Sequence, residues 1–312
     1  MLMWLRAIEE HINYKIKGYN VNNLSLLVMA AGMGSRYGGL KQLDSFGPNN
    51  ETIIDYSVYD AIKSGFEKIV FIIREEFSED FKTKISDKFK DRIDVEHVYQ
   101  SLDQVPKSFS VPNSRSKPWG TGHAILSAKN AISGPFMAIN GDDFYGRQSF
   151  QVASNFYQNE ENKFCMVSFK LENTLSEFGG VSRGVCASFE RQLISVEETH
   201  YIEKKDGEIR SNEKIFHGDE LVSMNMWGFG IQVFDYLEER FKLFLNDYGN
   251  EEKSEFLIPI VVSDLIKEGV ESVDVLNSNE KWFGVTFPED KKNVSESILK
   301  LTSDGAYPEK LF

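Results

Sequence analysis

The stretch LSLLVMAAGMGSRYGGLKQL, residues 24–43, runs from a short apolar segment into a glycine-rich loop that contains one arginine and one lysine. The apolar part predicts a buried β-strand because it is short and continuous. A glycine-rich turn directly after such a strand is typical of phosphate sites, since its backbone N–H groups can point at an anion. Two interpretations follow: a dinucleotide-binding turn, or a cradle for the triphosphate of a nucleotide.

The spacing of the glycines favours the triphosphate. A G-x-G-x-x-G turn that begins at Gly32 would need its third glycine at position 37, where the sequence has Tyr37. Arg36 and Lys41 follow closely instead, and two cations can neutralise much of the charge of a triphosphate. A tight strand-to-helix turn with solvated cations is the alternative that needs no ligand.

The pattern downstream predicts the fold class. Strand-like apolar runs at 68–74, 95–100 and 135–140 alternate with segments of helical periodicity. We therefore expect an α/β protein with a Rossmann-like, mixed but mainly parallel sheet sandwiched by helices. Between residues 164 and 230 the pattern changes to strand-like segments that predict antiparallel additions, and the C-terminal part is again helical.

Composition narrows the class of protein. The formal net charge of −13 makes a nucleic-acid or anionic membrane partner unexpected, because such partners are normally met by a basic surface. Two cysteines are too few for a disulfide framework or a cysteine zinc site. No apolar run approaches the ~20 residues of a spanning helix, and the start lacks a secretory signal, so we expect a cytoplasmic protein.

Polar residues follow two of the predicted strands, where ligands of open α/β sheets usually bind. Asp142 and Asp143 come just after the run 135–140, and carboxylates suit Mg²⁺, although paired acids in a turn can also be solvated capping groups. Gln100 closes the run 95–100, and its amide offers both a donor and an acceptor to the edge of a base. An exposed amide at a strand end is the alternative.

In this order the motifs resemble those of the nucleotidyltransferases that make nucleoside-diphosphate sugars. The likeness covers roughly residues 24–295 and implies that family's fold, with an inserted antiparallel sugar-binding part. We therefore expect an N-terminal extension over 1–23, a nucleotidyltransferase domain over 24–295 and a C-terminal helix and tail over 296–312. The motifs are LLVMAAGMGSRYGGLKQL, VEHVYQ, PWGTGHAI, INGDDFYG, FGGV, VSMNMWGF and WFGVTFPED.

The resemblance implies a role for each matching residue. Arg36 would contact the departing phosphates, Lys41 the α-phosphate, and Asp142 a Mg²⁺ ion, with Asp143 beside it. The other implied residues bind the nucleotide (Ala31, Gly32, Gly34, Ser35, Gln100, Gly120 and Thr121) or the hydroxyls of the sugar (Gly179, Glu198 and Asn225).

The resemblance also implies the reaction, which is nucleotidyl transfer from a nucleoside triphosphate, with UTP or dTTP favoured, to a sugar 1-phosphate. Two other functions stay open: a non-catalytic regulatory protein that binds nucleotide sugars, and a metal-dependent glycosyltransferase, which has less need of Arg36 and Lys41. A nicotinamide oxidoreductase is disfavoured by Tyr37. The apolar C-terminal helices can pack on the core or on a second copy of the chain, so a homo-oligomer is open too.

Two positions depart from the family pattern. Thr199 and His200 stand where the family commonly has Lys-Pro, so the lysine that meets the sugar phosphate is missing, and Lys204 or Lys205 are candidate substitutes. Gly284 stands in place of the second metal aspartate. Either Asp143 completes the metal site, or Asp142 and phosphates hold the metal, or activity is impaired.

Overall fold

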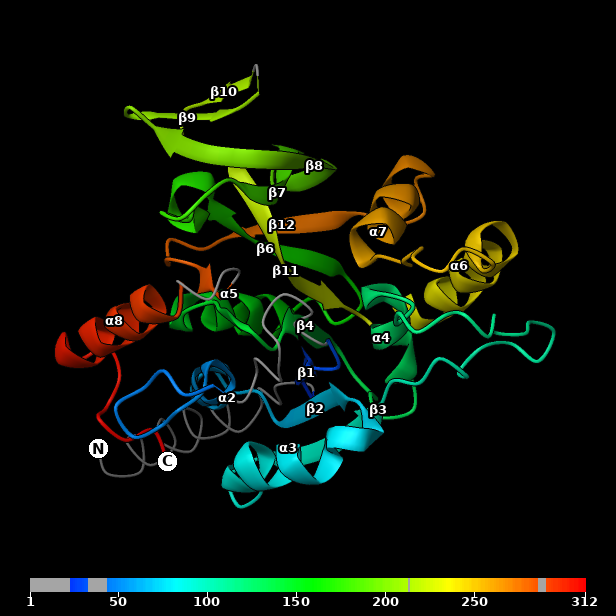
Figure 1. Cartoon of the computed structure of the whole chain (residues 1–312), viewed down its shortest axis with the longest axis horizontal. Coiled ribbons are helices and arrows are strands. Elements are labelled where there is room, and N and C mark those ends of the chain that lie inside the picture. The colour runs from blue at the N-terminus through cyan, green and yellow to red at the C-terminus, as the bar shows by residue number, and fades with distance from the viewer. Residues whose placement is uncertain (1–22, 33–43, 213, 286–289) are drawn as a thin grey trace, which may run out of the picture.

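The computed structural model describes residues 23–32, 44–212, 214–285 and 290–312, which fold around one large mixed sheet with helices on both faces (Figure 1). This confirms the predicted fold class. The strand order is β10-β9-β8-β12-β6-β11-β4-β1-β2-β3, with β7 paired to both β11 and β8. These strands are β1 (Ser25–Met29), β2 (Lys68–Ile73), β3 (Asp94–Tyr99), β4 (Phe136–Asn140), β6 (Phe164–Lys170), β7 (Val181–Phe189), β8 (Gln192–Lys205), β9 (Glu208–Ser211), β10 (Lys214–Phe216), β11 (Leu221–Phe229) and β12 (Val273–Asn277).

The sheet has a parallel part and a mixed part, in which strands pair antiparallel except for the parallel pairing of β12 with β6. Strands β3, β2, β1 and β4 pair in parallel. Strand β11 runs antiparallel to β4 and β6, and β7 to β10 continue this antiparallel part as hairpins that project at the top of Figure 1. The antiparallel additions predicted between residues 164 and 230 are therefore present.

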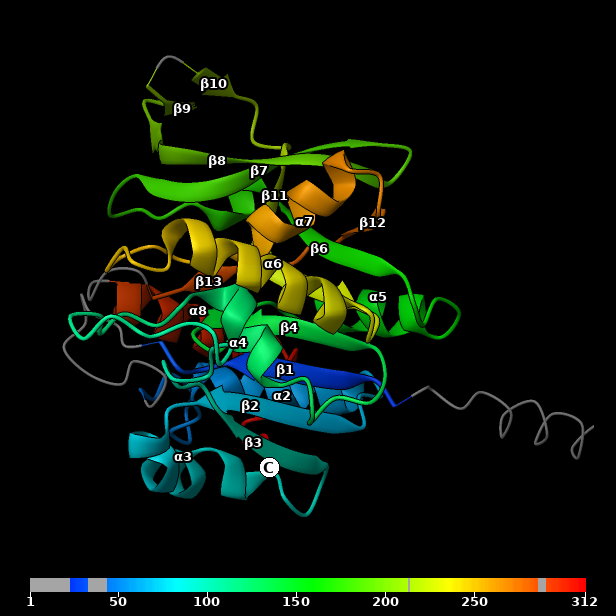
Figure 2. The same ribbon diagram turned by 90° about the vertical axis from the view of Figure 1, so that its right-hand side faces the viewer.

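Both faces of the central strands are apolar, and each face is covered by helices. In β1, Leu26 and Val28 belong to one core cluster, whereas Leu27 belongs to the other, as the alternation of side chains along a strand requires. Figure 2 shows α4, α6 and α7 in front of the sheet. The helices are α2 (Ile53–Lys63), α3 (Ser78–Lys84), α4 (Thr121–Ser127), α5 (Arg147–Tyr157), α6 (Val233–Tyr248), α7 (Ile258–Lys267) and α8 (Asp290–Ser303), with 3₁₀ turns η2 (Glu75–Phe77), η3 (Ser86–Lys88) and η4 (Leu171–Thr174).

A third apolar cluster joins the C-terminal residues to the rest of the fold. Ile298 of α8 is fully buried, and Tyr307 and Leu311 pack with it beside α2. The cluster includes Phe144 of the two-residue strand β5 (Asp143–Phe144), whose ring stacks on Phe283 of β13 (Phe283–Gly284) at 4.3 Å. The C-terminal helix therefore supports the two short strands that carry Asp143 and Gly284.

The division into domains stays a prediction. The expected N-terminal extension lies almost wholly outside the described residues, and the expected boundary after residue 295 falls within α8. No helix in the described part of the chain is long and apolar enough to cross a membrane.

If α8 is an integral part of the fold, Ile298→Ala will lower the free energy of unfolding by about 2–5 kcal/mol, because it removes a buried side chain and leaves a cavity. Leu299→Ala is the matched control, since Leu299 is 48% exposed in the same helix and its loss should change stability by about 0.5 kcal/mol or less. Chemical denaturation measures both values. Equal effects of the two variants would mean that α8 does not pack as described.

Candidate functional site

The predicted phosphate loop begins where β1 ends. Ala31 is buried, and among the described residues a Cβ atom on Gly32 would meet nothing within 4 Å. Gly34, Ser35, Arg36 and Lys41 lie outside the described residues, and their roles stay predictions.

The acidic turn lies directly beside this loop. The Gly141 N–H donates to the Met29 carbonyl at 2.9 Å, and a Cβ on Gly141 would come within 3.2 Å of both that carbonyl and the Ala30 side chain. The glycine therefore allows the turn after β4 to pack against the end of β1. This contact places the acidic turn beside Met29 and Ala30, at the end of β1.

Asp143 is held in place from two sides. It is 8% exposed, and its Oδ2 atom accepts a hydrogen bond from Asn140 Nδ2 at 2.8 Å and lies 3.3 Å from the Tyr145 hydroxyl. Burial, and then the charge of Asp143, raises the pKa of Tyr145 well above its usual value, so this hydroxyl stays protonated. Asp143 is thus a fixed carboxylate rather than a solvated turn residue.

Gly284 lies directly opposite Asp143. Strands β5 and β13 pair antiparallel, and the register matches Gly284 with Asp143. A Cβ on Gly284 would lie 2.5 Å from Asp143 Oδ1, closer than real side chains allow. The Asp143 carboxylate therefore occupies the space that a side chain at position 284 would need.

A cavity of about 210 Å³ opens beside this pair and contains three of the predicted residues. Asp143, Glu198 and Asn225 line it, whereas Gly179 lies in the loop before β7 and is not part of its lining. Asn225 has a φ of +59°, at an irregularity of β11 between Ser223 and Trp227. Such left-handed backbone is uncommon outside glycine and is often found at functional sites, and here it interrupts the regular alternation of the strand.

A second cavity, of about 430 Å³, lies at the carboxyl ends of β2 and β3 and is lined by Gln100, Trp119 and His123. Gln100 Nε2 lies 3.3 Å from the Gly120 carbonyl, which can only accept, so the amide nitrogen must face it. His123 Nε2 lies 2.9 Å from the Gln104 carbonyl and must carry a proton for the same reason. The bare His123 Nδ1 then accepts from Gln100 Nε2 at 3.1 Å.

These two carbonyls fix the polarity of the Gln100 amide. Both of its N–H groups are used inside the protein, which leaves Oε1 as the atom that can meet a ligand. Burial lowers the pKa of His123 to about 4, so the ring is neutral near pH 7 and can accept from Gln100. His123 is thus a positioning residue for the amide.

Gly120 and Thr121 contact Phe256 and Ile258, at and just before the start of α7. Gly120 has a φ of +106°, and a Cβ there would lie 2.7 Å from the Phe256 carbonyl. Thr121 Oγ1 accepts from the Ile258 N–H at 3.1 Å, at the start of α7. In this arrangement the Gly120 carbonyl accepts from Gln100 and Thr121 Oγ1 accepts from the Ile258 N–H, so a base contact by the Thr121 hydroxyl would use its O–H as the donor.

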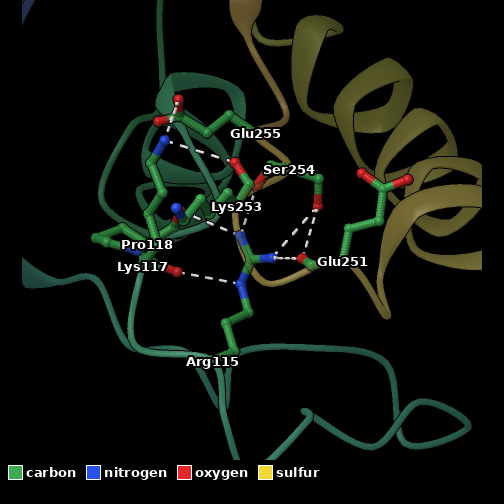
Figure 3. A network of polar contacts seen from close by, with 7 residues as sticks. All are labelled: Arg115, Lys117, Pro118, Glu251, Lys253, Ser254 and Glu255. Atoms are coloured by element: carbon green, nitrogen blue, oxygen red, sulfur yellow. Dashed lines mark hydrogen bonds and ion pairs between the residues drawn. The ribbon is translucent and has the colours of Figure 1, made fainter.

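The long loop before Gly120 is tied to the segment between α6 and α7 by Arg115 (Figure 3). Its guanidinium donates to the Glu251 carbonyl at 2.6 Å and to the Ser254 carbonyl at 2.7 Å, and it stacks on the Trp119 ring at 3.5 Å. Lys117 adds an ion pair with Glu255 at 2.7 Å. The loop is therefore an ordered wall of the cavity that contains Gln100.

Sequence reasoning missed two residues of the smaller cavity, Arg183 and Trp282. Arg183 pairs across β7 and β8 with Thr199, the position where the family lysine is missing. The candidate substitutes Lys204 and Lys205 lie farther along β8, where they pair with β9, and do not line the cavity. The only charged residue of the strand-like stretch Val181–Phe189 was the available signal.

Comparisons with known proteins identify the family of this chain. The family model described as "Nucleotidyl transferase" matches residues 26–290, and the chain therefore belongs to the nucleotidyl transferase family, a family of enzymes. The bifunctional protein GlmU of Methanococcus maripaludis is 27% identical over 221 residues, which are 69% of this chain and 42% of that protein. The chain thus spans less than half of that relative.

Solved structures share the fold at low sequence identity. The inositol-1-phosphate CTP transferase of T. maritima superposes with a TM-score of 0.62 at 14% identity, over 89% of this chain and 96% of that one. A UDP-glucose pyrophosphorylase in complex with UDP-glucose gives a TM-score of 0.58 at 17% identity, over 88% and 98%.

The buried neutral state of His123 predicts an acid sensitivity. Its folded pKa of about 4 lies below the ordinary 6.5, so as pH falls below 6.5 the unfolded chain takes up a proton that the folded chain does not. Stability should then fall by about 1.4 kcal/mol per pH unit until pH 4. In His123→Gln, the difference in unfolding free energy between about pH 7.5 and about pH 5 should shrink by about 2 kcal/mol.

Denaturant titrations at the two pH values measure this difference. The control is Leu299→Ala, which changes an exposed side chain without a titratable group and should leave the difference as in the wild type. An unchanged difference in His123→Gln would contradict the buried, neutral ring.

Proposed function

We propose that this protein transfers a nucleotidyl group from a nucleoside triphosphate to a sugar 1-phosphate and releases pyrophosphate. The observation that carries the proposal is the contact between the ends of β1 and β4, which sets the Asp142–Asp143 turn beside the start of the glycine-rich loop. The cavity with Glu198 and Asn225 adjoins this turn through Asp143. An acceptor in that cavity would therefore face a triphosphate held by the loop.

The chemistry needs alignment and charge neutralisation more than a base. A sugar phosphate is already largely ionised near pH 7, since its second pKa is about 6, so its oxygen can attack the α-phosphate without prior deprotonation. Two anions must approach each other while pyrophosphate leaves, and oriented cations stabilise that change. Arg36 and Lys41 are the residues that we assign to this role.

The acidic turn fits a magnesium ion. Mg²⁺ is usually held by one or two carboxylates, with phosphate oxygens and waters completing the shell, and Asp142 with the fixed Asp143 supplies such a pair. No cluster of three or more metal-binding side chains occurs in the described ranges, which agrees with a site that the substrate completes. When bound, the ion would neutralise phosphate charge and help to align the α-phosphate.

We place the base in the cavity of Gln100. Because the amide presents Oε1, the base should offer an N–H at that point, as N3–H of uracil or thymine does. The names of the structural neighbours, an inositol-1-phosphate CTP transferase and a UDP-glucose pyrophosphorylase, support a phosphate ester as acceptor and leave the base open between pyrimidines.

A regulatory protein that binds nucleotide sugars without turnover is the second candidate. The absence of a carboxylate at position 284 favours it. The position of Asp143 argues against it, since that carboxylate already fills the space next to Gly284.

Pyrophosphate release measured with Mg²⁺ over a grid of nucleoside triphosphates and sugar 1-phosphates tests the activity. We expect turnover with UTP or dTTP, and weak turnover with 3-methyluridine triphosphate, which lacks N3–H. Lys41→Ala and Asp142→Asn should each lower kcat/KM by about 100-fold or more, because each removes charge that stabilises the transition state.

Lys204→Ala, which removes an exposed lysine on β8, is the control and should keep wild-type activity. Tight nucleotide binding without turnover on any pair would contradict the enzymatic function and favour the regulatory protein. Equal use of UTP and its 3-methyl analogue would contradict the assignment of Gln100.

The Asp143–Gly284 contact predicts the outcome of exchanging the two residues. Asp143→Asn should weaken Mn²⁺ binding by about tenfold or more, and Gly284→Asp should do so too, because its side chain would clash with Asp143 Oδ1. The double variant Asp143→Gly with Gly284→Asp restores a single carboxylate to the same space and should recover most of the affinity.

Electron paramagnetic resonance of Mn²⁺ with nucleotide present measures the affinities. The control Asp274→Asn changes a carboxylate on β12 that pairs with Gln192 and should have no effect. A double variant that binds no better than either single one would show that Asp143 does not act in place of a residue at 284.

A further inference from the structure

One wall of the smaller cavity carries a buried guanidinium. Arg183 of β7 is only 7% exposed and lines this cavity. Its Nε donates to the Thr174 hydroxyl at 3.1 Å, its Nη1 to the Ser182 carbonyl at 2.8 Å, and its Nη2 to the Thr174 carbonyl. The indole of Trp282 covers the guanidinium at 4.8 Å.

These neutral acceptors fix the guanidinium, and none of them forms an ion pair with it. Among the described residues, no carboxylate oxygen lies within 4.0 Å of it, and Asp143, Glu198 and Asp290 act on it only from farther away. Burial lowers the pKa of Arg183 to about 10, which still leaves the side chain charged near pH 7. Buried charges in proteins are normally paired, so this cavity wall is suited to an external anion.

A second donor in the same wall is also unsatisfied. The Trp282 Nε1–H is buried and has no hydrogen-bond acceptor among the described residues. Trp282 is 8% exposed and belongs to the lining of the cavity. An unpaired buried N–H costs about 1–3 kcal/mol, and a turn of the indole toward the cavity would let a ligand oxygen relieve that cost. A buried guanidinium and an unsatisfied N–H thus belong to two residues that line the same cavity.

The other side of the cavity is suited to a polyol. Glu198 and Asn225 offer acceptors and donors that can bridge neighbouring hydroxyls, and Ser182 and Ser223 add two more hydroxyls. A small molecule that carries both hydroxyls and a phosphate monoester would match the polar groups on both sides of the cavity.

We infer that Arg183, with Trp282, binds the phosphate of the sugar-phosphate acceptor. This inference rests on the proposed function and names the residue that recognises the acceptor. Because Arg183 lies opposite Thr199 in the β7–β8 register, their side chains share a face of the sheet, so a lysine at position 199 would place its ammonium near the same point.

The test compares Arg183→Gln, Trp282→Phe, and Arg183→Gln combined with Thr199→Lys. In steady-state assays, Arg183→Gln should raise KM for the sugar phosphate by about 10- to 100-fold, as expected for a lost charge-assisted hydrogen bond, and leave KM for the nucleotide within about twofold. Trp282→Phe, which keeps a ring but removes the N–H, should raise the same KM by a smaller factor of about 3- to 10-fold.

The double variant separates recognition from folding. If Arg183 only anchors Thr174, a lysine at 199 cannot replace it, and KM will stay high while the melting temperature falls. If Arg183 binds the phosphate, the double variant should return KM for the sugar phosphate to within about threefold of wild type. Lys205→Gln, which removes an exposed cation from the same strand β8, is the control and should change neither KM.

A binding measurement keeps this inference distinct from the proposed reaction. Isothermal titration with a panel of hexose 1-phosphates and inorganic phosphate, and with free glucose as the neutral probe, requires no turnover. Wild-type protein that binds the phosphates but not glucose, with binding lost in Arg183→Gln, supports the inference even if no reaction occurs. Wild-type protein that binds none of the phosphates, or Arg183→Gln that binds them as tightly, overturns it.

Discussion

The parallel pairing of β1 with β2 and β4 is the constraint on which the rest of the site depends. Met29 lies opposite Ile72 on one side and Asn140 on the other, so the three strands end at the same edge of the sheet. The chain leaves that edge as a glycine-rich loop after β1 and as an acidic turn after β4. A glycine at 141 lets the second segment pack on the first, because any larger side chain would meet Met29 and Ala30.

Much of this arrangement could be predicted because it is encoded locally. Continuous apolar runs indicated the parallel strands, and the changed pattern after residue 164 indicated the antiparallel ones. Asp142 and Gln100 could be named as candidate site residues for the same reason, since each follows a recognisable strand in a fold whose ligands bind at strand ends. Asp143, Glu198 and Asn225 line one cavity, and Gly179 does not belong to its lining.

The contacts between distant segments could not be predicted. No sequence feature near Gly284 indicates that the Asp143 carboxylate occupies the space that a side chain at position 284 would need. This arrangement arises from the pairing of β5 with β13. The orientation of Gln100 likewise depends on carbonyls of Gly120 and Gln104, on either side of a long loop. Such hydrogen-bond polarity follows from tertiary geometry and has no periodic signature in the chain.

Charge placement lets a protein of negative net charge offer a local site to an anion. A net charge of −13 acts mostly through screened solvent, over a distance of about 8 Å at physiological salt, whereas a buried guanidinium acts at contact in a medium of low dielectric constant. Arg183 is kept in that medium by neutral oxygens of Thr174 and Ser182, which satisfy its geometry without cancelling its charge. A carboxylate in their place would form an ion pair with the guanidinium and repel an incoming anion. The use of neutral oxygens therefore agrees with the anion site that we infer.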